Sequence, residues 1–226
     1  MRKQPMQKRS QQMVEALVDA AGEVIAEQGL DRFTTIEVAE RAGVSVGSLY
    51  QYFANKEALL AALLDRLTRR LGEVVNRTAP LLLEADLKTI VQGLLEAALE
   101  FFASDEGLYL ELLRNWYRLD IGRSLHYFEQ TMMDVTRIYL LSHTSELRFD
   151  NAAAKQFVVT NSVVFTLLRY LSLPPPPGFG REQLVEELTA MIAHYLRESP
   201  PRRSPGLGPH GSGRRAERRP RRIHKS

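Results

Sequence analysis

The 226-residue sequence contains no cysteine, which excludes disulfide bonds, thiolate metal sites and cysteine nucleophiles. Long apolar runs are absent too. The longest, residues 58–64, is far shorter than the roughly 18 residues that a membrane helix needs. The basic N-terminus has no apolar segment behind it and does not resemble a secretory signal. We therefore expect a cytoplasmic protein that does not enter a membrane.

Motifs for catalysis are also missing. None of the histidines has metal-ligand spacing, and neither a Walker loop nor a Gly-x-Ser-x-Gly elbow occurs. Residues 206–211 match Gly-x-Gly-x-x-Gly as a string. They lie in a Pro- and Arg-rich tail, without the strand and helix that a dinucleotide site requires. The sequence predicts no enzyme, no metal and no cofactor.

Charge is segregated along the chain, although the formal net charge is only +3. Residues 1–10 carry four basic groups and no acid, and residues 202–226 carry nine basic groups and one acid. The body between them is therefore net −9. A basic isoelectric point that arises from the chain ends is weak support for nucleic-acid binding.

The apolar pattern predicts an all-α protein, because no sustained alternation of strand type and no internal repeat occurs. Four segments are expected: a basic flexible arm at 1–10, a small helical domain at 11–56, a larger helical domain at 57–197 and a disordered tail at 198–226. The first helix should run over 11–28, since apolar residues recur there at helical spacing and Gly29 follows.

Short helix signals follow closely. Thr34 and Glu37 form a capping box that starts a second helix, and Gly43 ends it. Ser45 can cap a third helix, and Asn55 can cap a fourth. Two short helices joined by a tight glycine turn and flanked by longer helices predict a helix-turn-helix unit.

The third helix has an apolar side and a polar side. Leu49 and Phe53 fall on one face and should anchor it. The residues expected to point outward are Val46, Gly47, Ser48, Tyr50, Gln51 and Tyr52. Hydroxyl groups and Lys56 suit phosphate contacts, and Gln51 suits base edges. From spacing alone, a three-helix cap with a solvated polar face is an equal alternative.

Residues 33–59, FTTIEVAERAGVSVGSLYQYFANKEAL, closely resemble the DNA-binding domain of TetR-type transcriptional repressors. The resemblance covers roughly residues 11–60 and implies a homodimer that places one helix per subunit in successive major grooves of an inverted repeat. It implies phosphate contacts from Thr35, Tyr50, Tyr52 and Lys56. It also implies base or groove contacts from Ser45, Val46, Gly47, Ser48 and Gln51.

One feature opposes this resemblance: residues 11–60 are net −5, whereas DNA-binding domains usually carry a basic surface. Acids of the first helix could face away from DNA, while the arm at 2–9 supplies phosphate contacts. Deleting residues 1–9 should then weaken binding and flatten its salt dependence.

The larger domain should contain helices at 56–76, 86–103, 105–119, 122–143, 151–172 and 181–197. The resemblance implies an effector pocket in the middle helices. The residues expected to line it are Phe102, Tyr109, Leu113, Trp116, Tyr117, Phe128 and Met132. Apolar stripes at helical spacing are more often plain core. The charge of the effector stays open, because Arg114, Arg118 and His126 would suit an anion and Glu111, Asp120 and Asp134 a cation.

The last two helices carry wide apolar faces, which the resemblance assigns to dimerisation. The candidate residues are Phe157, Asn161, Val164, Leu168, Leu184, Leu188, Met191 and Tyr195. Core packing within one chain explains these faces equally well. The resulting hypothesis is a dimeric repressor released from DNA by a small molecule, with the helix that begins at Lys56 as the lever. An activator remains an alternative, and the tail is expected to bind polyanions without specificity.

Overall fold

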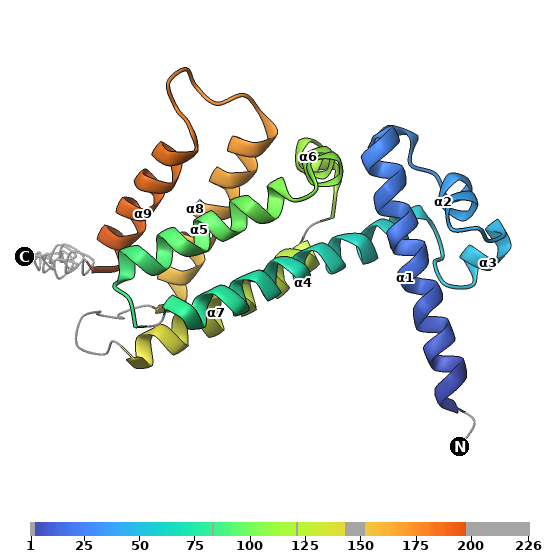
Figure 1. The fold of residues 1–226 in the computed structure, drawn as a ribbon, viewed down its shortest axis with the longest axis horizontal. Helices are drawn as coiled ribbons and strands as arrows, with labels where there is room; N and C mark the ends of the chain where they lie inside the picture. The colour runs from blue at the N-terminus through green and yellow to red at the C-terminus, as the bar shows by residue number, and fades with distance from the viewer. Residues whose placement is uncertain (1–2, 83, 121, 143–151, 198–226) are drawn as a thin grey trace, which may run out of the picture.

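The computed structural model describes residues 3–82, 84–120, 122–142 and 152–197. In these ranges every regular element is helical, as predicted. The elements are α1 Lys3–Gln28, η1 Leu30–Arg32, α2 Thr35–Arg41, α3 Val46–Tyr50, α4 Lys56–Leu82, α5 Leu87–Ala103, α6 Glu106–Arg114, η2 Trp116–Arg118, α7 Gly122–Ser142, α8 Ala152–Ser172 and α9 Arg181–Arg197. Figure 1 shows α1–α3 at one end, α5 and α7–α9 at the other, and α4 running between them.

Side-chain caps start α2, α3 and α4 where the sequence predicts them. The backbone N–H of Glu37 donates to Oγ1 of Thr34 at 3.2 Å. In the same way, the N–H of Ser48 donates to Oγ of Ser45 at 3.0 Å, and the N–H of Ala58 donates to Oδ1 of Asn55 at 2.8 Å. Gly43, between α2 and α3, has a φ of 68°, a left-handed conformation that favours glycine. The predicted helix-turn-helix geometry is therefore present.

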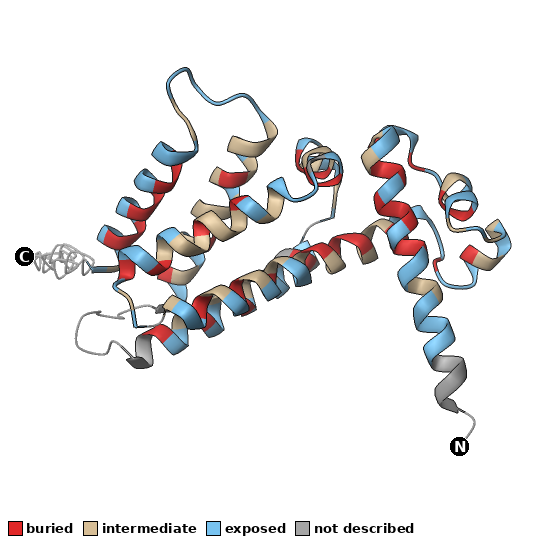
Figure 2. Cartoon of the chain, viewed as in Figure 1, coloured by how far each residue is buried: buried red, intermediate tan, exposed pale blue. Residues whose placement is uncertain are grey.

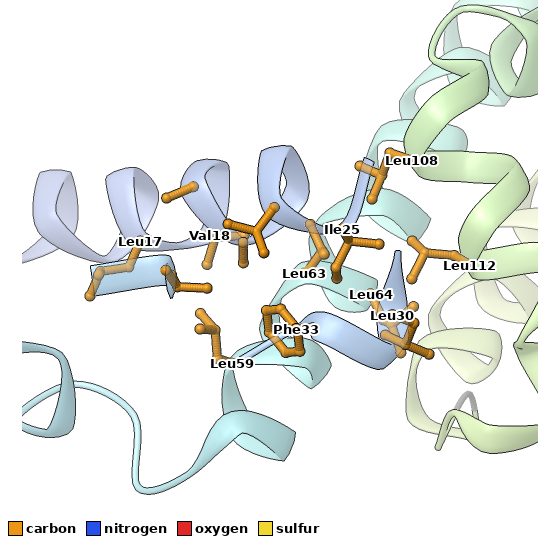
Figure 3. Close-up of a cluster of buried hydrophobic side chains, with 14 of the residues drawn as sticks. Leu17, Val18, Ile25, Leu30, Phe33, Leu59, Leu63, Leu64, Leu108 and Leu112 are labelled. Atoms are coloured by element: carbon orange, nitrogen blue, oxygen red, sulfur yellow. The ribbon is translucent and has the colours of Figure 1, made fainter. Parts of the chain in front are cut away.

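One apolar core joins these short helices to both α4 and α6. Leu17 and Ile25 of α1, Leu49 of α3 and Leu63 of α4 are fully buried. Figure 3 shows Leu108 of α6 reaching the same cluster. Because this core draws on α6, the N-terminal domain is fixed against the larger domain.

The larger domain has its own apolar clusters, and Figure 2 shows buried residues along α9 and at several places on α5. Leu184 and Leu188 of α9 are buried against Leu95 and Leu99 of α5. Assigning these two leucines to a dimer interface was wrong, because their apolar surface is already covered within the chain.

Two predicted boundaries change. Helix α1 begins at Lys3, so described residues 3–10 are helical rather than a flexible arm. Pro5 is compatible with this start because its missing N–H falls in the first turn. Helix α4 continues through Pro80 to Leu82 instead of ending at residue 76. Packing of Val75 and Ala79 against Val135 of α7 offsets the hydrogen bond that Pro80 cannot donate.

Two further expectations concern segments between and after the described helices. The predicted interhelical stretch at 143–150 and the basic tail at 198–226 lie outside the described residues. Within the described ranges, no helix combines the length and apolar character needed to span a membrane.

Candidate functional site

Helix α3 is anchored on one face and open on the other. Leu49 is completely buried and Phe53 is 7% exposed, so these two side chains fix the helix against α1 and α4. Gly47 and Gln51 are exposed on the outer face. Val46 is half-buried and packs partly against the core, so only part of its side chain is left for a ligand.

Hydroxyl groups gather where α2 begins and α3 ends. The Thr35 hydroxyl lies 3.2 Å from the Tyr50 hydroxyl, within hydrogen-bond distance. The Tyr50 side chain is 51% exposed and Tyr52 is 37% exposed, although both are large and aromatic. Lys56 is exposed at the start of α4. The structure thus pairs two of the four side chains for which phosphate contacts are predicted, Thr35 and Tyr50, and leaves Tyr52 and Lys56 exposed.

Ser45 and Ser48 form a second polar pair, at the start of α3. Their hydroxyl oxygens are 2.8 Å apart, and Ser45 also caps the helix. A Cβ atom on neighbouring Gly47 would meet nothing closer than the Ser45 Oγ, at 3.8 Å. Packing within the chain therefore does not require a glycine at this position. Because Gly47 has no side chain, a ligand on the outer side of α3 is able to approach the helix backbone closely.

Acidic residues of α1 are engaged by arginines from other helices. Arg41 of α2 donates to Glu23 at 3.2 Å and to Glu27 at 2.8 Å. Its hydrogen bonds hold the pKa of the Glu27 carboxyl below its usual range. Asp19 pairs with Arg66 of α4. Arg41 is already counted in the net −5 of residues 11–60, whereas Arg66 lies outside this range, so only the Asp19–Arg66 pair reduces the excess negative charge.

The N-terminal half of α1 projects beyond the three-helix core in Figure 1. Lys8 and Arg9 are exposed on this helical extension. A helix holds these charges at a fixed distance from α3, unlike a flexible arm. Charge neutralisation is consequently a cleaner test of their role than deletion, which would also shorten α1.

We expect the double substitution Lys8→Gln and Arg9→Gln to weaken DNA binding at low salt. The slope of log affinity against log salt should fall by about 0.9 for each phosphate that the protein no longer neutralises. Affinity measured by fluorescence anisotropy at several salt concentrations tests this. The control is Arg69→Gln with Arg77→Gln, which removes two exposed charges from α4. An equal decrease of slope in both variants would contradict a specific role for the α1 extension.

The larger domain contains a partly open cavity of about 280 Å³. Its walls come from α4–α9, with a lining that is almost wholly aliphatic and aromatic. The predicted residues that line it are Phe102, Tyr109, Leu113, Trp116, Phe128 and Met132. Tyr117 does not line the cavity. It lies in η2 with 71% of its surface exposed, so the prediction that it lines the effector site was wrong. An apolar cavity of this size suits a small organic ligand.

Aromatic rings close one end of the cavity. Phe101 and Tyr109 stack with centroids 4.8 Å apart, and Phe102 packs edge-on to Tyr109 at 6.0 Å. Trp116 meets Phe165 of α8 edge-on at 5.8 Å. Burial raises the pKa of the Tyr109 phenol, so this ring presents a neutral hydroxyl.

Helix α6 and η2 lie between this aromatic end and the N-terminal domain. The Glu111 carboxylate accepts a hydrogen bond from the backbone N–H of Leu30 at 2.9 Å. Arg118 pairs with Asp31 at 2.7 Å. Glu111 and Arg118 therefore make contacts between the two domains and not the contacts with an effector that were predicted for them. Neither residue lines the cavity.

The remaining charged candidates, Arg114, His126, Asp120 and Asp134, are exposed and do not line the cavity either. Among the described residues, Lys155 is the only charged residue that does. It is 5% exposed. Lys155 is not among the residues predicted to line the cavity, although it is four residues before Val159 and continues the cavity-lining stripe of α8.

The outer faces of α8 and α9 carry exposed apolar side chains. Of the predicted dimer residues, Phe157 is 65% exposed, Met191 45% and Tyr195 37%. Asn161 is half-buried on the same helix as Phe157. Val164 and Leu168 instead line the cavity, so their assignment to the interface is not supported by their position. Large exposed apolar side chains are compatible with an interaction site when they lie next to one another.

No group of histidine and acidic residues in the described ranges is arranged to hold a metal ion.

Comparisons with known proteins connect the N-terminal domain to a known family. Residues 17–63 match the family model described as bacterial regulatory proteins, tetR family. The helix-turn-helix domain is therefore of the TetR-family type. A TetR-family transcriptional regulator from Streptomyces coelicolor is 24% identical, with a TM-score of 0.58 over 81% of this chain and 97% of that one. A TetR regulator from Rhodococcus sp. RHA1 is 19% identical, with a TM-score of 0.59 over 84% and 97%.

Among curated proteins, the chain is similar to the nucleoid occlusion factor SlmA of Haemophilus ducreyi, at 33% identity over 108 residues. That match covers 48% of this chain and spans about half, 51%, of the relative. The TetR-family fold continues through the larger domain, as the structural matches show. TetR-family regulators are DNA-binding transcription factors rather than enzymes.

Proposed function

We propose that this TetR-family protein is a homodimeric transcriptional repressor that binds an inverted-repeat operator and releases it when a small molecule enters the cavity. The observation that carries the proposal is that a single helix, α4, belongs to both sites. Leu59 and Leu63 lie in the core that supports α3, and Leu67 and Leu71, further along the helix, line the cavity. A ligand that displaces the middle of α4 would therefore move the DNA-binding surface.

Helix α6 provides a second connection. Its residues Leu112 and Leu113 line the cavity, while Glu111 holds the backbone at Leu30. A ligand needs differential affinity for two conformations to shift their populations. Contacts with α4 and α6 would supply that difference, because both helices touch the ligand site and the N-terminal domain.

Dimerisation is assigned to the exposed faces of α8 and α9, through Phe157, Met191 and Tyr195. Two recognition helices must lie about 34 Å apart to enter successive major grooves. The position of α3 at the opposite end of the molecule from α9 (Figure 1) is compatible with one such helix per subunit.

The first experiment is selection of random duplex DNA by purified, ligand-stripped protein at about 0.15 M salt, which screens nonspecific attraction. We expect enrichment of an inverted repeat whose half-sites are about one helical turn apart. Light scattering of the same sample should give a dimer.

Enrichment of a single half-site would contradict the homodimer, and no enrichment would remove sequence-specific binding from the proposal. Once an operator is known, compounds can be screened for its release at fixed salt. A compound that occupies the cavity but leaves operator affinity unchanged would refute control by this cavity.

A further inference from the structure

The cavity is elongated. On α8 its lining runs from Lys155 to Leu171, which is about 24 Å at the rise of an α-helix. On α5 it runs from Leu87 to Phe102, about 22 Å. The cavity volume is about 280 Å³, so a ligand that fills it would be extended along these two helices rather than compact.

The lining offers little to a charged ligand. Among the described lining residues none is acidic, and Lys155 is the only basic one. Lys155 is already engaged by the chain, because its ammonium group donates to the carbonyl oxygen of Tyr195 at 3.4 Å and lies 5.7 Å from the centre of that ring. An ion in this cavity would lose its water without gaining an opposite charge that is free to match it, which is costly. The lining therefore favours an uncharged ligand.

Two polar lining side chains donate their hydrogen bonds within the chain. The Thr68 hydroxyl donates to the carbonyl oxygen of Leu64 at 3.0 Å. The Ser124 hydroxyl donates to the carboxylate of Asp65 at 2.8 Å. Since a hydroxyl group has one hydrogen to donate, neither side chain has one left for a ligand. Most of the ligand surface would therefore meet apolar groups and should be hydrocarbon.

A hydrogen-bond donor is available near the start of α8. Thr136 donates to Gln156 at 2.7 Å, and Gln156 donates to Thr160 at 2.8 Å. The Thr160 hydroxyl accepts that bond, so its own hydrogen is left for another acceptor. Thr160 lines the cavity and is only 4% exposed. Because an unsatisfied buried donor is costly, an oxygen atom of a ligand would be stabilised at this position.

The aromatic rings lie further along α8. Trp116 lines the cavity and meets Phe165 of α8, which is about 8 Å past Thr160 along the helix. A chain that begins at Thr160 and runs toward Leu171 would therefore pass Trp116. Leu113 of α6 lines the same part of the cavity, where its carbonyl oxygen accepts a hydrogen bond from Ser172 at the end of α8.

We propose that the cavity binds an uncharged, elongated hydrocarbon with a single oxygen atom, which accepts a hydrogen bond from Thr160 while the chain extends past Trp116. This rests on the proposed function, since it takes the cavity to be the effector site. Thr160 and Leu171 are about 16 Å apart along α8. An alcohol with twelve carbon atoms, at most about 17 Å along its bonds, matches this span.

The first test compares one chain with three end groups. Purified full-length protein, stripped of ligand, is titrated near neutral pH with dodecan-1-ol, dodecanoate and dodecan-1-amine, each below its solubility limit. Binding is followed by emission of Trp116, the only tryptophan in the chain, and by displacement of the neutral dye N-phenyl-1-naphthylamine. We expect the alcohol to bind at least about tenfold more tightly than either ion. Equal or tighter binding of an ion, or no binding of the alcohol, would overturn the proposal.

Substitution of Thr160 tests the position of the oxygen atom. Thr160→Val nearly keeps the shape of the side chain and removes its hydroxyl. The affinity for dodecan-1-ol should then fall about threefold to tenfold, as is typical of one neutral hydrogen bond. The affinity for the dye, which has no oxygen atom, should stay the same. Thr160→Ser retains the hydroxyl and should restore binding of the alcohol.

Thr189→Val is the matched control, because Thr189 of α9 is also buried and does not line the cavity. It should leave the affinities for alcohol and dye unchanged. Thermal unfolding checks that every variant is folded. An alcohol affinity that is unchanged in Thr160→Val, or that falls equally in Thr189→Val, would contradict the hydrogen bond from Thr160.

Operator release is measured separately, by anisotropy of the selected DNA. Binding of the alcohol without operator release would refute effector control and leave the ligand class intact. Operator release by dodecanoate or dodecan-1-amine, but not by the alcohol, would refute the ligand class alone.

Discussion

Replacing Gly47 with leucine is expected to weaken specific DNA binding at least about thirtyfold while leaving the protein folded. Gly47 lies on the exposed side of α3, and a Cβ atom there would meet no atom of the chain closer than 3.8 Å. A larger side chain therefore fits the free protein. It would instead occupy the space through which the backbone of α3 approaches the floor of the major groove.

The expected size of the effect follows from overpacking. Forcing extra methylene groups into a close-packed contact costs about 1–3 kcal/mol. A symmetric dimer meets the obstacle in both half-sites, so operator binding would lose about 2–6 kcal/mol, which is at least about thirtyfold in affinity. Gly47→Ala adds one methyl group and should lose much less.

Measuring the stability of the variants distinguishes a loss of DNA contact from misfolding. Glycine inside a helix destabilises it by roughly 0.5–1 kcal/mol relative to alanine, so both variants should unfold at the same urea concentration as the wild type or a higher one. Binding is measured by anisotropy with the selected operator. An operator affinity unchanged in Gly47→Leu would show that this face of α3 does not approach DNA closely.

Local sequence signals predicted the N-terminal domain in detail because each signal acts over a few residues. Thr34, Ser45 and Asn55 cap helices at positions set by their own side chains, and Gly43 adopts the turn conformation that glycine permits. The start of α1 was missed, because residues 3–10 lack apolar periodicity and their helix continues from the packed segment that follows.

The sequence did not predict which side of each helix packs against distant parts of the chain. Leu184 and Met191 both belong to the apolar pattern of α9, yet the first is buried against α5 and the second is exposed. Likewise, Trp116 lines the cavity and adjacent Tyr117 faces away from it. The side of a helix that becomes buried depends on neighbouring helices that are far away in the sequence. A stripe of apolar residues at helical spacing does not identify those neighbours.

Replacing Leu63 with alanine is expected to destabilise the protein more than most single substitutions do. Leu63 is fully buried where α1, α4 and α6 converge. A Cβ atom on Gly22 of α1 would lie 3.8 Å from Leu63 and 3.3 Å from Leu108 of α6. The three helices are thus already in close contact at Gly22. Little collapse can refill the space of a missing leucine side chain, which places the cost at about 3–5 kcal/mol.

Leu81→Ala is the matched control, since it makes the same substitution in the same helix at a residue that is 83% exposed. It should change the free energy of unfolding by less than about 0.5 kcal/mol. Urea unfolding, followed by circular dichroism and by Trp116 fluorescence, measures both variants. Equal destabilisation by the two substitutions would contradict the packing argument.

The two probes also report how the domains are joined. Trp116 lies in the larger domain, whereas Leu63 supports the core beneath α3. That core includes Leu108, Tyr109 and Leu112 of α6, so loosening it should weaken both domains together. We therefore expect coincident transitions in Leu63→Ala, shifted to lower urea. If helicity were lost first, with no change at Trp116, the N-terminal domain would unfold independently, and a signal from the cavity could not reach α3 through this core.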